Sequence, residues 1–219
     1  NGCTGISSLN LGNVIEIQES SFSGCTEIRN LNLSKITTLG NSAFDGCTNV
    51  VNLVIPISLD VSSKLSSITK LTSVEFTGGT DGIGIDYYSS YSSTPWYKSK
   101  NTLTRLTINE DVKEVGRYTF YDLSNISSEI DFSDIESIGE YAFYNCKNLK
   151  NICAPNTLEY INPQAFQNSG LVSVNLSNSN LTRIEAVTFG YCHNLCNVSL
   201  PKTLIVINDR AFFNSNISS

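Results

Sequence analysis

Apolar and polar positions along this chain recur in a unit of 22 or 23 residues. Three early copies follow the pattern Gly-Cys-Thr, four variable residues, Leu-x-Leu/Ile, and begin at Gly2, Gly24 and Gly46. The same period recurs in a phenylalanine three residues before the Cys position, at Phe22, Phe44, Phe120, Phe143, Phe166, Phe189 and Phe212. Self-similarity at such a period is typical of a repeat protein, in which each unit adopts the same local structure.

Each unit predicts a short strand followed by a turn. In 71–76 the apolar residues Leu71, Val74 and Phe76 are spaced by polar ones, which favours a strand with one buried face. A second apolar pair before each phenylalanine, such as Leu158 and Ile161, predicts a second inward wall. The residues two places after the phenylalanine are types that readily adopt positive φ and predict a tight turn: Gly24, Gly46, Asp122, Asn145, Asn168 and Asn214.

One unit of this length cannot bury its own apolar side, but stacked units can, so the pattern predicts a solenoid of about nine to ten coils. Leu65 and Tyr97 fill the phenylalanine position between Phe44 and Phe120. Those two residues are 32 apart, so one coil carries an insertion of about ten residues, and we expect an inserted loop at about 77–94.

The segment 138–149, IGEYAFYNCKNL, resembles the I-G-x-x-A-F-x-x-C-x-x-L signature of BspA-like leucine-rich repeats. Residues 40–47 fit the same signature, 161–169 and 207–215 fit it more loosely, and 94–100 resemble an atypical coil of bacterial members. The resemblance implies a leucine-rich-repeat, right-handed solenoid, β-rich with short helical turns. We expect residues 1–219 to form a single array of this kind, as a fragment of a longer protein.

The Cys position of this signature departs from the family at Lys100, Leu123, Ser169 and Ser215. A lysine is rarely buried without a partner, so we expect the coil that holds Lys100 to be distorted. The family itself implies a surface or secreted protein of bacteria or some protists. Some of its members are adhesins for host matrix proteins or other cells.

Seven cysteines raise the question of disulfides or zinc. Cys3, Cys25, Cys47, Cys146 and Cys192 share one repeat position, which predicts a buried packing ladder. Neighbouring members of the ladder, above all Cys25 and Cys47, could approach disulfide distance. Cys153 and Cys196 fall outside the ladder, where we expect exposed or half-exposed thiols, and the absence of a C-x-x-C pair argues against zinc.

Composition and motifs argue against several function classes. Fourteen basic against twenty acidic residues leave a net charge of −6, which disfavours nucleic acid as a partner. The longest apolar stretch, about 50–57, is far shorter than the ~18–20 residues of a membrane span. The single histidine, His193, is expected to point away from Cys192, and no nucleotide, hydrolase or metal motif occurs. We therefore expect no catalytic residue, no metal, no cofactor and no enzyme activity.

The candidate contacts with a ligand are Tyr87, Tyr88 and Tyr91 of the inserted loop, together with Glu75 and Asp131. Tyrosine offers a large contact area at small entropic cost, so a projecting loop would suit recognition. The alternative is that the rings fold back to plug the wider coil. We expect Trp96 and Tyr97 in the core, and Tyr118 and Tyr141 beside Tyr121 and Tyr144 as side-to-side packing between coils.

Glu75 and Asp131 belong to an outward strand position whose residues are polar and short. The stripe comprises Asn10, Asn32, Val54, Glu75, Thr107, Asp131, Cys153, Asn175 and Ser199. It is either a recognition surface or simply a solvated sheet face. Six N-x-S/T sequons also occur, at Asn32, Asn125, Asn175, Asn180, Asn197 and Asn216, a number that this composition produces by chance.

Two functions follow as hypotheses. The first is a non-catalytic binding or adhesion module, monomeric as a fragment, that recognises a host matrix protein, another cell's protein or a cell-surface glycan. The second is an architectural spacer that displays other domains and has no ligand of its own.

Overall fold

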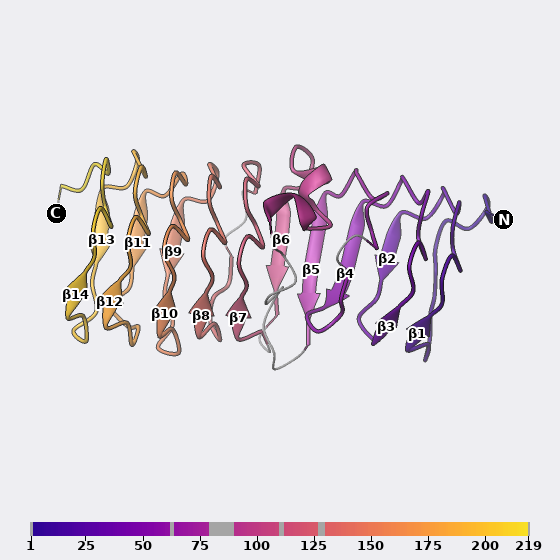
Figure 1. Cartoon of the computed structure of the whole chain (residues 1–219), viewed down its shortest axis with the longest axis horizontal. Helices are drawn as coiled ribbons and strands as arrows, with labels where there is room; N and C mark the ends of the chain where they lie inside the picture. The colour runs from indigo at the N-terminus through magenta and orange to yellow at the C-terminus, as the bar shows by residue number, and fades with distance from the viewer. Residues whose placement is uncertain (1, 62–63, 79–89, 110–111, 127–129, 219) are drawn as a thin grey trace.

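The computed structural model describes residues 2–61, 64–78, 90–109, 112–126 and 130–218. The chain forms a parallel β-solenoid of about eight turns, with its two ends at opposite ends of the rod (Figure 1). This confirms the predicted solenoid. The expected number, nine to ten coils, is slightly larger than the number of turns in the structure. The described helices are the single turns η1 (Tyr91–Ser93), within the inserted segment, and η2 (Tyr97–Ser99), just after it.

Each coil contributes up to two short strands, which stack in separate parallel sheets. One stack holds β2 (Asn30–Asn32), β4 (Asn52–Pro56), β5 (Ser73–Thr77) and β6 (Arg105–Ile108), then β9 (Asn151–Cys153), β11 (Ser173–Asn175) and β13 (Asn197–Ser199). The other holds β1 (Glu16–Ile17) with β3 (Thr38–Leu39), β7 (Glu114–Val115) with β8 (Ser137–Ile138) and β10 (Tyr160–Ile161), and β12 (Arg183–Ile184) with β14 (Val206–Ile207).

The insertion leaves the sheet register intact. Strand β5 pairs with β4 through Ser73 and Asn52, and with β6 through Ser73 and Arg105. The extra residues therefore lie between two neighbouring strands without breaking the ladder. The segment with η1 and η2 lies on the solenoid next to β5 and β6 (Figure 1).

Aromatic rings form the centre of the core. Phe143 stacks on Phe166 with ring centroids 5.1 Å apart, and Phe166 stacks on Phe189 at 5.5 Å. In the coil with the insertion, Trp96 is fully buried against Phe76 and Phe120. The expected core position of Trp96 is confirmed, whereas that of Tyr97, which holds the phenylalanine position in the sequence, was wrong because Tyr97 is only half-buried. The larger indole fills the space and donates from Nε1 to the Thr119 carbonyl oxygen at 2.5 Å.

The cysteine ladder is buried at Cys25, Cys47, Cys146 and Cys192, as predicted, whereas Cys3 in the first turn is exposed. All seven cysteines are free thiols, Cys153 is exposed and Cys196 half-exposed. Three thiols of the ladder also bond to the backbone, because each lies within reach of the carbonyl oxygen of a phenylalanine in the preceding coil. The Sγ atoms of Cys47, Cys146 and Cys192 lie 3.2–3.3 Å from those oxygens.

Two left-handed backbone positions shape the turn around each phenylalanine. The predicted one is confirmed, with φ of 60° at Asp122, 59° at Asn145 and 60° at Asn168. A second lies two residues before the phenylalanine and was not predicted. Its occupants are Ser20, Ser42, Tyr118, Tyr141, Gln164, Val187 and Arg210. These are not residue types that favour positive φ, so the tertiary structure imposes the conformation.

Candidate functional site

Six tyrosines cluster on the turns next to the insertion, and we call them the tyrosine platform: Tyr91, Tyr97, Tyr118, Tyr121, Tyr141 and Tyr144. Tyr118 and Tyr141 stack at 5.1 Å, and Tyr121 and Tyr144 stack at 4.7 Å, which confirms the predicted packing between coils. Within a coil the two rings meet edge to face at 5.9 Å.

The insertion adds Tyr91 to this platform. Its ring stacks on Tyr121 at 4.7 Å and contacts Tyr97 at 5.4 Å, yet 41% of the residue is exposed. Tyr87 and Tyr88, the other two tyrosines expected to contact a ligand, lie outside the described residues. The platform therefore includes one of the three predicted loop tyrosines.

The segment that carries Tyr91 is bonded to both neighbouring coils. On one side, the Ser99 hydroxyl accepts from the Leu71 backbone N–H at 3.1 Å, and Lys98 Nζ donates to the Ser66 carbonyl oxygen at 3.0 Å. On the other, Trp96 donates to Thr119. These contacts hold Tyr91 in a defined position, so little side-chain entropy is left to lose on binding.

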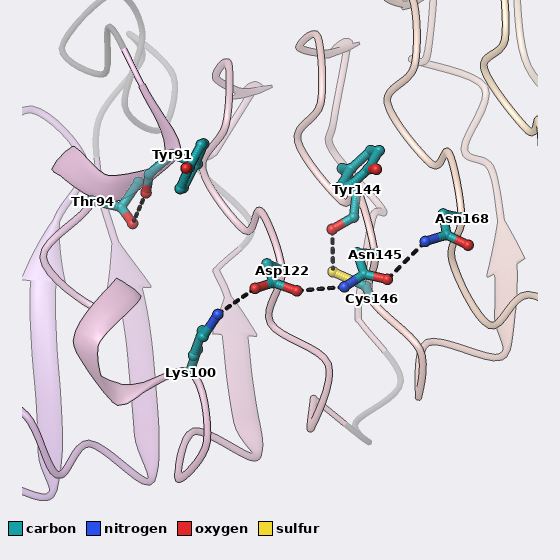
Figure 2. A network of polar contacts seen from close by, with 8 residues as sticks. All are labelled: Tyr91, Thr94, Lys100, Asp122, Tyr144, Asn145, Cys146 and Asn168. Atoms are coloured by element: carbon teal, nitrogen blue, oxygen red, sulfur yellow. Dashed lines mark hydrogen bonds and ion pairs between the residues drawn. The ribbon is translucent and has the colours of Figure 1, made fainter.

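A line of polar side chains runs along the coils beside the platform, and we call it the polar ladder (Figure 2). Lys100 Nζ lies 2.5 Å from Asp122 Oδ2, Asn145 Nδ2 donates to Asp122 Oδ1, and Asn168 Nδ2 donates to Asn145 Oδ1 at 2.9 Å. Lys147 Nζ ends the ladder by donating to Asn168 Oδ1 at 2.7 Å. The amides are thus aligned between a cation and an anion.

The polar ladder explains how a lysine occupies the Cys position. The Lys100 side chain is half-exposed and hydrogen-bonded to Asp122. This hydrogen bond raises the pKa of Lys100, so the lysine is a cation with an anionic partner. Sequence reasoning found the turn residues of the ladder but not their bonds. The recurrence of Asp or Asn two places after the phenylalanine was the available signal, and it was interpreted only as a preference for positive φ.

Tyr121 and Tyr141 of the platform are neutral groups at neutral pH. Burial, together with the neighbouring Tyr144 and Asp122, raises the pKa of Tyr121 to about 12, and burial also raises the pKa of Tyr141. Their hydroxyls can therefore donate and accept hydrogen bonds at neutral pH, but they do not supply a nucleophilic phenolate.

The two carboxylates predicted as ligand contacts make local bonds. Glu75 Oε1 accepts from Asn109 Nδ2 at 3.3 Å, and Asp131 Oδ1 accepts from the Ser133 backbone N–H at 2.9 Å. Glu75 pairs in register with Val54 and Thr107, within the predicted outward stripe. Within the described part of the chain, the polar contacts of both carboxylates are thus with their own turn or the next coil, not with the tyrosine platform.

Cys192 and His193 do not meet as a catalytic pair. Cys192 is buried with its Sγ on the Phe166 carbonyl oxygen, while the exposed His193 has Nδ1 3.1 Å from the Asn214 carbonyl oxygen. Among the described residues, no group of three or more His, Cys, Asp or Glu side chains is placed to hold a metal ion. No helix in the described part of the chain is long and apolar enough to cross a membrane.

Comparison with known sequences identifies the repeat. The family described as the BspA type leucine rich repeat region matches residues 1–95 and 113–219, in six copies. No curated protein matches.

Solved structures share the fold at low sequence identity. A leucine-rich repeat protein from Bacteroides ovatus is 20% identical, with a TM-score of 0.61 over 92% of this chain and 56% of the other. A chain of the Toll–Spatzle complex from Drosophila is 18% identical, with a TM-score of 0.60 over 91% of this chain and 27% of the other. The chain thus spans about half of the first structure and about a quarter of the second.

Proposed function

Since the chain belongs to the BspA-type leucine-rich repeat family, we propose that it is a non-catalytic binding module of a cell-surface or secreted protein. Its ligand is a protein or glycan of a host or neighbouring cell, such as a matrix protein or a cell-surface glycan. The tyrosine platform is the contact surface. Extended repeat scaffolds serve recognition in this way because neighbouring coils present a continuous surface.

The observation that carries this proposal is the anchored, exposed position of Tyr91. Tyrosine is enriched among the residues that dominate binding energies, because its ring offers a large area with few rotatable bonds. Here the ring is supported by Tyr121 beneath it and by a segment bonded to two coils. The rigid support and the exposure of this ring favour a role for Tyr91 in ligand contact.

A spacer without a ligand is the second candidate function. The rings of Tyr118 and Tyr141, and of Tyr121 and Tyr144, already stack between coils, which a purely architectural solenoid also needs. Tyr91 distinguishes the two functions. It belongs to the insertion and not to the repeat, so stacking between repeat units does not account for it.

The test is solid-phase binding of the purified chain to fibronectin, fibrinogen and a glycan array at physiological salt. Tyr91→Ala should weaken any saturable binding by about tenfold or more, which is the loss expected of an aromatic hot-spot residue. The urea midpoint of unfolding should change little.

Tyr160→Ala is the matched control, because Tyr160 is 62% exposed in β10 and lies off the platform. It should bind like the parent chain. Equal losses in the two variants would refute the platform as the contact surface. Absence of saturable binding to all of these probes would favour the spacer.

A further inference from the structure

The structure uses the asparagines of the six sequons in different ways. Asn32 and Asn175 stand at the ends of β2 and β11, and both begin the sequence Asn-Leu-Ser. Their Oδ1 atoms accept from the backbone N–H of the serine two residues later, at 2.9 Å for Ser34 and 3.0 Å for Ser177. At Asn175 the Ser177 hydroxyl also donates to Oδ1, at 2.7 Å.

This turn presents the sequon outward. Leu33 and Leu176, the central residues of the two sequons, are fully buried, so the asparagine and the serine on either side face away from the core. The bonds at Oδ1 fix the amide and leave Nδ2 without a hydrogen bond to the described part of the chain. Nδ2 is the atom that N-linked glycosylation modifies.

In three other sequons the Nδ2 atom of the asparagine already donates a hydrogen bond within the chain. Asn125 Nδ2 donates to the Asn101 carbonyl oxygen at 2.8 Å, and Asn180 Nδ2 donates to the Asn156 carbonyl oxygen at 2.7 Å. Both bonds brace one coil against the preceding one. Asn197 Nδ2 donates to Cys196 Sγ at 3.4 Å.

The last sequon lacks the turn that Asn32 and Asn175 form. The Ser218 backbone N–H, which would bond Asn216 in such a turn, donates instead to the Cys196 carbonyl oxygen at 3.3 Å.

We propose that Asn32 and Asn175 are the N-glycosylation sites of this chain. In the reaction, Nδ2 attacks C1 of a lipid-pyrophosphate-linked oligosaccharide. The C1–N bond forms, the C1–O bond breaks, the lipid pyrophosphate leaves with the electron pair, and the amide proton passes to the transferase. The proposal rests on the proposed function only in requiring that the chain enter a secretory compartment that contains such a transferase.

The two sites have a consequence for recognition. Asn32 and Asn175 both belong to the outward stripe, and Asn175 pairs in register with Cys153 and Ser199 of neighbouring strands. Glycans there cover parts of the sheet face near which Glu75 and Asp131 would otherwise contact a ligand. None of the six sequon asparagines belongs to the tyrosine platform, so no glycan would be attached there.

The experiment expresses the full chain behind a secretion signal in mammalian cells and measures the occupancy of each sequon by glycopeptide mass spectrometry. We expect occupancy at Asn32 and Asn175 to be several-fold higher than at Asn125 and Asn180. Similar occupancy at all four, or none at Asn32 and Asn175, would overturn the proposal.

A gain-of-site variant tests the geometry directly. Asp131 already forms the same turn with Ser133, so Asp131→Asn places an Asn-Phe-Ser sequon at 131–133 in the arrangement seen at Asn32. This variant should acquire a glycan at 131, and adding Ser133→Ala should remove it. An unmodified Asp131→Asn chain would count against the role of the turn.

The binding assay keeps the two proposals separate. Unglycosylated chain produced in bacteria is tested against the same matrix proteins and glycan array. If the bacterial chain binds a probe but the secreted chain carries no glycan at Asn32 and Asn175, only the modification proposal is refuted. If the secreted chain carries glycans at both sites but no probe is bound, only the recognition function is refuted.

Discussion

Replacing Asp122 by Asn tests whether the polar ladder holds the central coils together. Asp122 has φ of 60°, a conformation that Asp and Asn both adopt readily, so Asp122→Asn keeps the turn. The change removes the carboxylate that accepts from Lys100 and from Asn145. One amide oxygen can still accept, but the charge that pairs with the lysine is lost.

The magnitude follows from the bonds and their exposure. A hydrogen bond to a charged group contributes about 1.5–3 kcal/mol when solvent is excluded. The side chains of Lys100 and Asp122 are 33% and 22% exposed, so water screens part of that contribution. We therefore expect Asp122→Asn to lower the free energy of unfolding by about 1–2 kcal/mol, with a fall in Tm of roughly 2–4 °C per kcal/mol.

The assay is urea unfolding at pH 7 of four chains: the parent, Asp122→Asn, Lys100→Met and the double variant. If the ion pair is responsible, the double variant should lose less than the two single losses added together, with a coupling of about 1 kcal/mol. Asp131→Asn is the control, because the exposed Asp131 keeps its turn as Asn and should change stability by less than about 0.5 kcal/mol. Additive losses, or equal shifts for Asp122→Asn and Asp131→Asn, would refute the role of the ladder.

Two further predictions concern the backbone and the pH dependence of stability. Val187 is β-branched at φ of 57°, which costs about 1–2 kcal/mol for such a residue, so Val187→Asn should raise Tm; a lower Tm in a thermal melt would contradict this. Burial raises the pKa of Cys47 to about 11 and that of Tyr121 to about 12, whereas in the unfolded chain these groups ionise near their ordinary values of 9.0 and 10.0. Their contribution to stability is therefore complete below pH 9 and is lost as the pH rises toward the folded values, so the urea midpoint should fall between pH 9 and pH 11. A midpoint that holds steady across that range would show that the burial of these groups does not govern alkaline stability.

Much of the fold could be predicted because it depends on local pattern repeated many times. The spacing of Phe143, Phe166 and Phe189 predicted a column of rings, and those rings stack one coil apart. The type of residue at Asn145 and Asn168 predicted positive φ, because asparagine adopts this conformation more readily than most residues. The buried cysteines followed from the same register, since a small apolar residue suits an inward position.

The candidate site was predicted less completely. Tyr91 was predicted as a candidate contact residue, but its support by Tyr121 depends on how the inserted segment packs on the next coil. The replacement of Tyr97 by Trp96 at the centre of its coil depends on the space left by Phe76 and Phe120. Neither follows from spacing, because a shift of one residue in an irregular segment decides which ring points inward.

The repeat period, the inward and outward faces and the family could all be inferred from the amino-acid sequence alone. Each of these is a property of the single unit and therefore recurs in every copy along the chain. The partner of Lys100, the second left-handed turn position and the different bonding of Asn175 and Asn180 could be found only from the three-dimensional structure. These depend on contacts between residues of different coils or on the exact path of a turn, and side chains of the same type form different bonds when the atoms of the neighbouring coil differ.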